Sequence, residues 1–177
     1  MVAAGLGGDI TYCPAEEQGV GVITIRHEPP VAALSTWQLC LRFAGYAEDY
    51  ATAAMALGEA ANFFSARYFL FGHAFELILK SYILSKGADE RKLRELSHSL
   101  VKAYVEAKHL GYSPSDLRLE TIVDWIGAYH EHQDFRYAKT QGVTTMPGAA
   151  ETLAIFKNTH ADIYPLARAF YTERSRA

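Results

Sequence analysis

The chain has 177 residues, of which half are apolar and 21% are charged, and its formal net charge is −3. This composition is typical of a globular protein with enough chain to bury a real core in one domain, and it excludes an intrinsically disordered protein. A protein that grips a nucleic-acid duplex through its phosphates needs a strongly basic face, so the slightly acidic balance disfavours broad duplex binding. A local basic patch remains compatible with it.

The two cysteines, Cys13 and Cys40, indicate a reducing environment. They show neither a CxxC spacing nor histidines at a distance typical of zinc ligands, so we expect two free thiols, no structural metal and no cofactor. Residues 1–13 lack the basic start of a signal peptide. We therefore expect a cytoplasmic protein.

The most apolar stretch, residues 63–84, is long enough to raise the question of a membrane span. It contains four ionisable side chains, those of Arg67, His73, Glu76 and Lys80. Charges at this density are costly in a bilayer, which excludes a simple membrane-spanning helix.

Residues 1–33 differ from the rest of the chain because glycine and proline interrupt them repeatedly. The β-branched residues between positions 20 and 25 predict pairing with residues 10–12 in a short β-hairpin. An irregular arm is the alternative, and both interpretations stay open. Residues 34–177 are predicted to form a single helical domain.

Two helices are expected first in that domain. Ser35-Thr36-Trp37-Gln38 has the pattern of a capping box, and apolar residues recur at helical spacing from there to about Gly58. A second helix, over residues 63–85, is apolar on nearly all sides and ends at Gly87. Such a helix is expected at the centre of a bundle.

Three further elements complete the expected fold. A third helix starts near Asp89 or Ser97 and runs to residue 108, and a fourth starts at Ser113, with Pro114 in its first turn, and runs to about residue 132. Residues 134–147 are predicted to be a loop, and a last helix follows Pro147. Four to five helices with short connections predict an all-α fold, an up-and-down bundle.

His73, Glu76 and Lys80 are the most informative polar residues. They are spaced three and four positions apart, so they share one face of the apolar helix over residues 63–85. Charges on such a helix are costly unless they are paired. They form either a polar stripe that fixes the helix register or the lining of a cavity or interface groove.

Two other positions are candidate site residues with simpler alternatives. His98 lies near a predicted helix start, where it is either a base with a free nitrogen lone pair or a capping residue. Arg136, flanked by Phe135 and Tyr137, either points inward at a carboxylate or an anion or belongs to a loop clamped on the core.

His130 and His132 do not form a two-ligand metal face. Residues two positions apart on a helix point about 200° away from each other. We therefore expect no metal site at this pair.

Several short segments together resemble HEPN domains, the helical bundles of prokaryotic toxin–antitoxin and defence systems. They are Phe75-Glu76-Leu77-Ile78-Leu79-Lys80, the helix stop at Lys86-Gly87, His98-Ser99-Leu100 and Phe135-Arg136-Tyr137. The likeness covers about residues 46–140. It implies a helical bundle, a homodimer, an RNA or nucleotide ligand and an antitoxin protein as partner. The ligand-binding residues would be His73, Glu76, Lys80, Arg136 and Tyr137.

The resemblance also implies an alternative activity, metal-independent RNA cleavage. Active HEPN nucleases use an arginine, four to six residues and then a histidine, and Arg91 and His98 match that spacing. The histidine would move the proton of the 2′-hydroxyl, and the arginine would stabilise charge on the phosphate. Ser99 stands where these families often have aspartate. A purely structural bundle without a ligand site is the third hypothesis.

Overall fold

The chain divides into two units, Met1–Leu34 and Ser35–Ala177. The computed structural model describes residues 10–14, 21–25, 34–58, 63–132, 134–137 and 146–176. In the first unit, β1 (Ile10–Pro14) and β2 (Gly21–Ile25) pair as antiparallel strands. Ile10 lies opposite Ile25, and Pro14 lies opposite Gly21.

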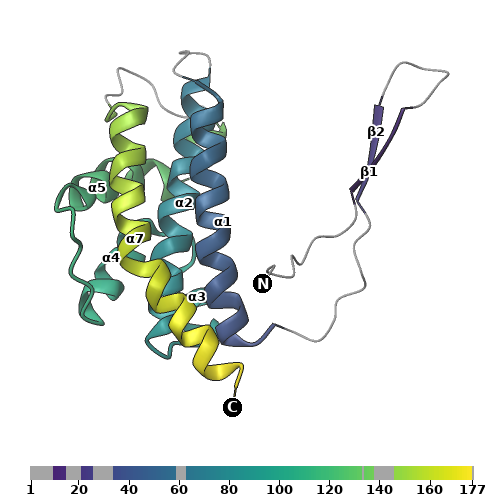
Figure 1. Cartoon of the computed structure of the whole chain (residues 1–177). Helices are drawn as coiled ribbons and strands as arrows, with labels where there is room; N and C mark the ends of the chain where they lie inside the picture. The colour runs from purple at the N-terminus through teal and green to yellow at the C-terminus, as the bar shows by residue number, and fades with distance from the viewer. Residues whose placement is uncertain are drawn as a thin grey trace. The chain divides into compact units, whose positions relative to one another are not determined.

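The second unit is all-helical over its described residues, which confirms the predicted all-α class for this part of the chain. Its helices are α1 (Thr36–Ala56), α2 (Phe64–Ser85), α3 (Glu90–Leu96), α4 (Leu100–His109), α5 (Arg118–Glu131), α6 (Asp134–Tyr137) and α7 (Ala149–Arg174). Figure 1 shows α1, α2 and α7 side by side, and α2 also packs against α4, α5 and α6. None of the described helices combines the length and the apolar character that crossing a membrane requires.

The central place of α2 follows from its sequence. Phe75, Ile78, Ile83 and Leu84 are all fully buried, and the helical repeat points them to different sides of α2. Burying each such side chain contributes about 1.5–3 kcal/mol. Neighbouring helices therefore cover α2 on several sides, as predicted for residues 63–85.

Local signals set the ends of the first two helices. Oε1 of Gln38 accepts a hydrogen bond from the backbone N–H of Ser35 at 3.0 Å, as in a capping box, and α1 begins at the next residue. After α2, Gly87 has a φ of +92°, a left-handed conformation that glycine adopts without a steric penalty.

The third predicted helix is in fact two helices. α3 ends at Leu96, and Ser97 has a φ of +52°, which redirects the chain. Ser99 then caps α4, because its hydroxyl accepts a hydrogen bond from the backbone N–H of Lys102 at 3.3 Å. His98 consequently lies in a turn between two helices.

The predicted start of the fourth helix at Ser113 is wrong, because α5 begins at Arg118. Two carboxylates hold the preceding segment in another conformation. Asp162 of α7 accepts the backbone N–H of Ser115 at 2.9 Å, and Asp116 accepts that of Arg118 at 3.1 Å. The expected loop after α5 also differs, since residues 134–137 form the helical turn α6.

Cys40 is a buried free thiol whose Sγ donates to the carbonyl oxygen of Ser81 at 3.2 Å. Burial raises the pKa of this thiol, and the hydrogen bond with Ser81 offsets only part of that effect. The side chain of Cys13 lies outside the described part of the structure.

Candidate functional site

Glu76 is a buried carboxylate on α2 around which four basic side chains gather. Its Oε1 accepts a hydrogen bond from Lys80 Nζ at 2.6 Å and lies 3.2 Å from Nδ1 of His98. Its Oε2 lies 2.7 Å from Nε2 of His130 and 3.7 Å from Nδ1 of His73. We call these five residues the Glu76 cluster.

Three parts of the chain supply the cluster. His73 and Lys80 lie one turn before and one turn after Glu76 on the same face of α2. His98 comes from the turn between α3 and α4, and the same turn is held to α2 because the carbonyl oxygen of Ser97 accepts a hydrogen bond from Lys80 Nζ. His130 comes from the last turn of α5. The helix break at residues 97–99 thus brings the imidazole of His98 to the carboxylate.

The cluster keeps Glu76 ionised although the side chain is only 2% exposed. Burial by itself would raise the pKa of this carboxyl. The hydrogen bond from His130, the charge of Lys80 and the hydrogen bond from Lys80 outweigh burial and lower the pKa to about 2. The carboxylate is therefore the fixed negative charge on which the surrounding side chains are oriented.

The cluster passes from the core to the surface. The side chains of His130 and Lys80 are 2% and 9% exposed, whereas those of His73 and His98 are 24% and 61% exposed. Tyr50 of α1 stacks on the His73 ring with centroids 5.5 Å apart. The outer rim of the cluster is thus made of two imidazoles and a partly exposed aromatic ring.

Close packing fixes the orientation of His130. Its Nε2 faces Glu76, while its Nδ1 is buried and has no hydrogen-bond partner in the described part of the chain. Nδ1 lies against Gly72, where an added Cβ would be 2.5 Å away. A glycine at this position therefore lets α5 bring the imidazole to α2.

Gly72→Ala is expected to lower the free energy of unfolding by about 1–3 kcal/mol, because the new methyl group must displace the His130 ring. Gly45→Ala is the matched control: this glycine also lies within a helix, α1, and a Cβ there meets nothing within 4 Å. The control should gain about 0.5–1 kcal/mol. Urea denaturation compares the two variants, and equal stability would contradict the packing described.

The structure brings together four of the site residues expected from the sequence, namely His73, Glu76, Lys80 and His98. Arg91 is placed differently. Its side chain is 78% exposed on α3, with Nε 3.9 Å from Asp89, and the end of α3 at Leu96 means that Arg91 and His98 do not share a helix. Their spacing therefore does not place the two side chains on one helix face.

The expected contribution of Arg136 and Tyr137 concerns side chains that lie outside the described part of the structure. Their backbone forms the end of α6, which packs against α2 and α5. Phe135, just before them, stacks on Tyr68 of α2.

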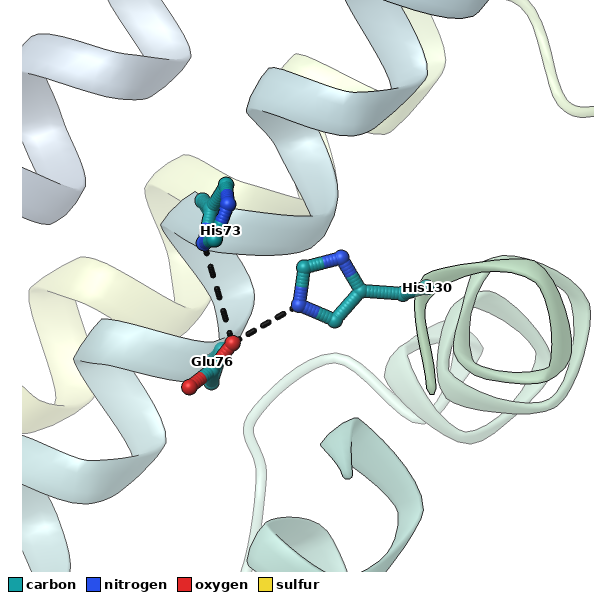
Figure 2. A group of neighbouring side chains, drawn as sticks. All are labelled: His73, Glu76 and His130. Atoms are coloured by element: carbon teal, nitrogen blue, oxygen red, sulfur yellow. Dashed lines mark hydrogen bonds and ion pairs between the residues drawn. The ribbon is translucent and has the colours of Figure 1, made fainter. Parts of the chain in front are cut away.

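Two residues of the site, His130 and Tyr50, were not among the predicted ones. A signal for His130 exists in the sequence, because it continues the buried face of α5 at helical spacing. His132 is exposed, so the two histidines do lie on different sides of the chain. His130 instead meets two possible metal ligands from α2: His73, Glu76 and His130 each offer a ligand atom, and these atoms lie within 4.8 Å of one another (Figure 2).

Comparison of the chain with protein-family models, with curated proteins and with solved structures finds no match. The geometry of the Glu76 cluster is therefore the basis for a proposed function.

Proposed function

We propose that this protein is a HEPN-like helical-bundle protein that binds a nucleotide or a short single-stranded RNA segment over the Glu76 cluster. The proposal includes a homodimer that serves as an interaction module of a toxin or defence system, with an antitoxin protein as partner. It also includes an up-and-down arrangement of the helices and a β-hairpin arm. The observation that supports ligand binding is that two exposed or partly exposed imidazoles, those of His98 and His73, lie beside a buried ionised carboxylate.

His98 is the expected phosphate contact. Its Nδ1 faces the ionised Glu76, which accepts hydrogen bonds only, so Nδ1 carries the proton in this pair. The other ring nitrogen, Nε2, then faces the ligand on an imidazole that is 61% exposed. It donates a hydrogen bond to a phosphate oxygen when the ring carries a second proton, and it accepts one from a hydroxyl when the ring is neutral. Glu76 thus fixes the orientation of the ring that meets the ligand.

An aromatic side chain beside the cluster suits a nucleobase. Tyr50 is 37% exposed and stacks on His73, and Tyr46, one turn earlier on α1, is 47% exposed. Single-stranded RNA is recognised mainly by stacking of splayed bases on aromatic rings together with polar contacts. The net charge of −3 favours a short ligand over a long RNA held through many phosphates.

Binding is tested with a fluorescein-labelled single-stranded RNA of mixed sequence, by anisotropy, and with the four nucleoside monophosphates, by calorimetry. We expect His98→Ala to weaken binding at least about tenfold, and Tyr50→Ala to lose the stacking of one base, about 1–3 kcal/mol. His132→Ala, an exposed histidine outside the cluster, is the matched control and should bind as the wild type does. Wild-type protein that binds none of these probes would contradict the proposal.

Metal-independent RNA cleavage is the second candidate, and one observation favours it. The His98 ring is oriented by an ionised carboxylate, as general acid–base catalysis requires, and the centroid of the His73 ring lies 6.4 Å from it. In this alternative, His98 moves the proton of the 2′-hydroxyl. The same labelled RNA, incubated in chelator, would be cut by the wild type and not by His98→Ala. Intact RNA without binding would leave a purely structural role for the cluster.

A further inference from the structure

Three ligand atoms of the kinds that zinc prefers lie together in the Glu76 cluster (Figure 2). They are Nδ1 of His73 and Oε2 of Glu76, both on α2, and Nε2 of His130 on α5. We propose that these three side chains bind a divalent transition-metal ion of the zinc class. This site does not rest on the proposed RNA or nucleotide binding, because a metal ion needs no other ligand there, although the two sites share His73.

The distances suit such an ion after small movements. Two ligand atoms that coordinate a tetrahedral zinc ion at about 2.0–2.1 Å are about 3.3–3.4 Å apart. The separations here are 2.7 Å from Glu76 Oε2 to His130 Nε2 and 3.7 Å from Glu76 Oε2 to His73 Nδ1, one shorter and one longer than that value. The two histidine nitrogens lie within 4.8 Å of each other, so shifts of these side chains by about 1 Å would give all three a bonding distance.

The chemical types of the three ligand atoms determine which metal ions the site prefers. Two imidazoles and one carboxylate form a set that zinc uses in protein sites where a fourth position is open to water. Calcium and magnesium prefer oxygen ligands, of which this set offers only the Glu76 carboxylate. The side chain of His73 is 24% exposed, so solvent reaches the site from that side. The site should therefore select Zn²⁺ or Co²⁺ over Ca²⁺ and Mg²⁺.

The position of the proton on the His130 ring predicts that the site binds its metal ion with moderate affinity. In the metal-free protein the Nε2–H of His130 donates to Glu76, and an ion at Nε2 requires that proton to move to Nδ1, with no net proton lost from a neutral ring. Nδ1–H would then face Gly72, with no acceptor among the described residues. A metal-ligating histidine without such an acceptor binds its ion about 10–100-fold more weakly.

Substitution of Lys80 distinguishes metal coordination by Glu76 from a purely structural role of the cluster. Its ammonium group lies 2.6 Å from Oε1 of the carboxylate whose Oε2 would hold the ion. The two positive charges repel each other in a poorly solvated site. Lys80→Met removes this repulsion, so the variant should bind the metal more tightly than the wild type, whereas loss of a merely structural contact would not increase affinity.

The experiment uses the full chain without an affinity tag, stripped of metal with a chelator that is then removed. Zn²⁺ binding is measured by calorimetry, and Co²⁺ binding by the visible absorption of the bound ion. We expect His73→Ala, Glu76→Gln and His130→Gln each to weaken Zn²⁺ binding at least about tenfold, Lys80→Met to strengthen it, and His132→Ala to leave it unchanged. Ca²⁺ and Mg²⁺ should give no heat.

Folding of each variant is checked by circular dichroism. His73→Ala alters the most exposed of the three ligands and therefore carries the least risk of unfolding. No Zn²⁺ binding by the wild type, or equal binding by wild type, His73→Ala and His130→Gln, would overturn the metal site. The RNA probes are used in chelator, so failure of the metal site and failure of the proposed function are distinguishable.

Discussion

Replacing Glu76 by alanine is expected to lower the free energy of unfolding by about 3–5 kcal/mol, one of the largest effects of any single substitution in this protein. The carboxylate accepts the hydrogen bonds of Lys80 and His130 in a place where water does not reach. Its removal leaves a buried ammonium group without its counter-charge. Urea denaturation at neutral pH measures the loss.

Glu131→Ala is the matched control for that substitution. Glu131 is 39% exposed on α5, and its Oε1 lies 3.7 Å from Lys102 Nζ. Exposed pairs of this kind contribute little, so we expect a change within about 1 kcal/mol. Equal destabilisation by Glu76→Ala and Glu131→Ala would contradict a buried, charged cluster.

The double variant Glu76→Leu with Lys80→Met separates two causes of the loss. It removes both charges of the pair and keeps apolar volume, and apolar replacement of a buried ion pair is often neutral or stabilising. We expect it to be more stable than Glu76→Ala. Equal instability of the two would mean that the unpaired ammonium group of Lys80 is not the cause of the loss.

Acid is expected to remove about 3 kcal/mol of stability through Glu76 alone. The pKa of this carboxyl is about 2 in the folded protein, against 4.5 as its ordinary value. A lowered folded-state pKa stabilises the fold above the ordinary value, and this contribution is lost as the pH falls from about 4.5 towards 2, at about 1.4 kcal/mol for each pH unit.

The measurement is urea denaturation of the metal-free protein across that pH range, with Glu76→Gln as the matched control. Other carboxyls with lowered pKa, Asp89 and Asp116, contribute equally to both proteins. The difference between the two therefore reports Glu76. Parallel pH dependence of wild type and Glu76→Gln would mean that the carboxyl is not held ionised by its neighbours.

Local sequence patterns predicted the parts of the site that lie on one helix. The apolar character of residues 63–85 placed α2 at the centre, and helical spacing placed His73, Glu76 and Lys80 on one face. The pattern could not say that this face meets α5, because that contact depends on how distant helices pack. His130 was therefore missed, although its spacing from the apolar residues of α5 indicates a buried position.

Tertiary contacts also explain the other differences between the sequence-based predictions and the structure. The capping signal at Ser113 and Pro114 competes with Asp162, which is 47 residues beyond Ser115 in sequence and accepts its backbone N–H. The spacing of Arg91 and His98 has structural meaning only if one continuous helix contains both. The turn at Ser97, whose carbonyl accepts from Lys80, interrupts that helix and carries His98 to the carboxylate instead.

A single buried carboxylate thus links the stability of this protein to its two proposed binding properties. The charge of Glu76 orients the outer imidazoles, His73 and His98, which we propose face the ligand. The inner imidazole, His130, makes the set complete enough for a metal ion.

The protonation state of Glu76 tests this account most directly. Carbon-13 NMR of the side-chain carboxyl, assigned by comparison with Glu76→Gln, follows that state as the pH is lowered. We predict a fully ionised carboxylate in the folded protein at pH 4.5, where an ordinary glutamate is half protonated. A carboxyl that is half protonated at that pH, or that takes up its proton at higher pH, would contradict the convergence of Lys80 and the three histidines on Glu76.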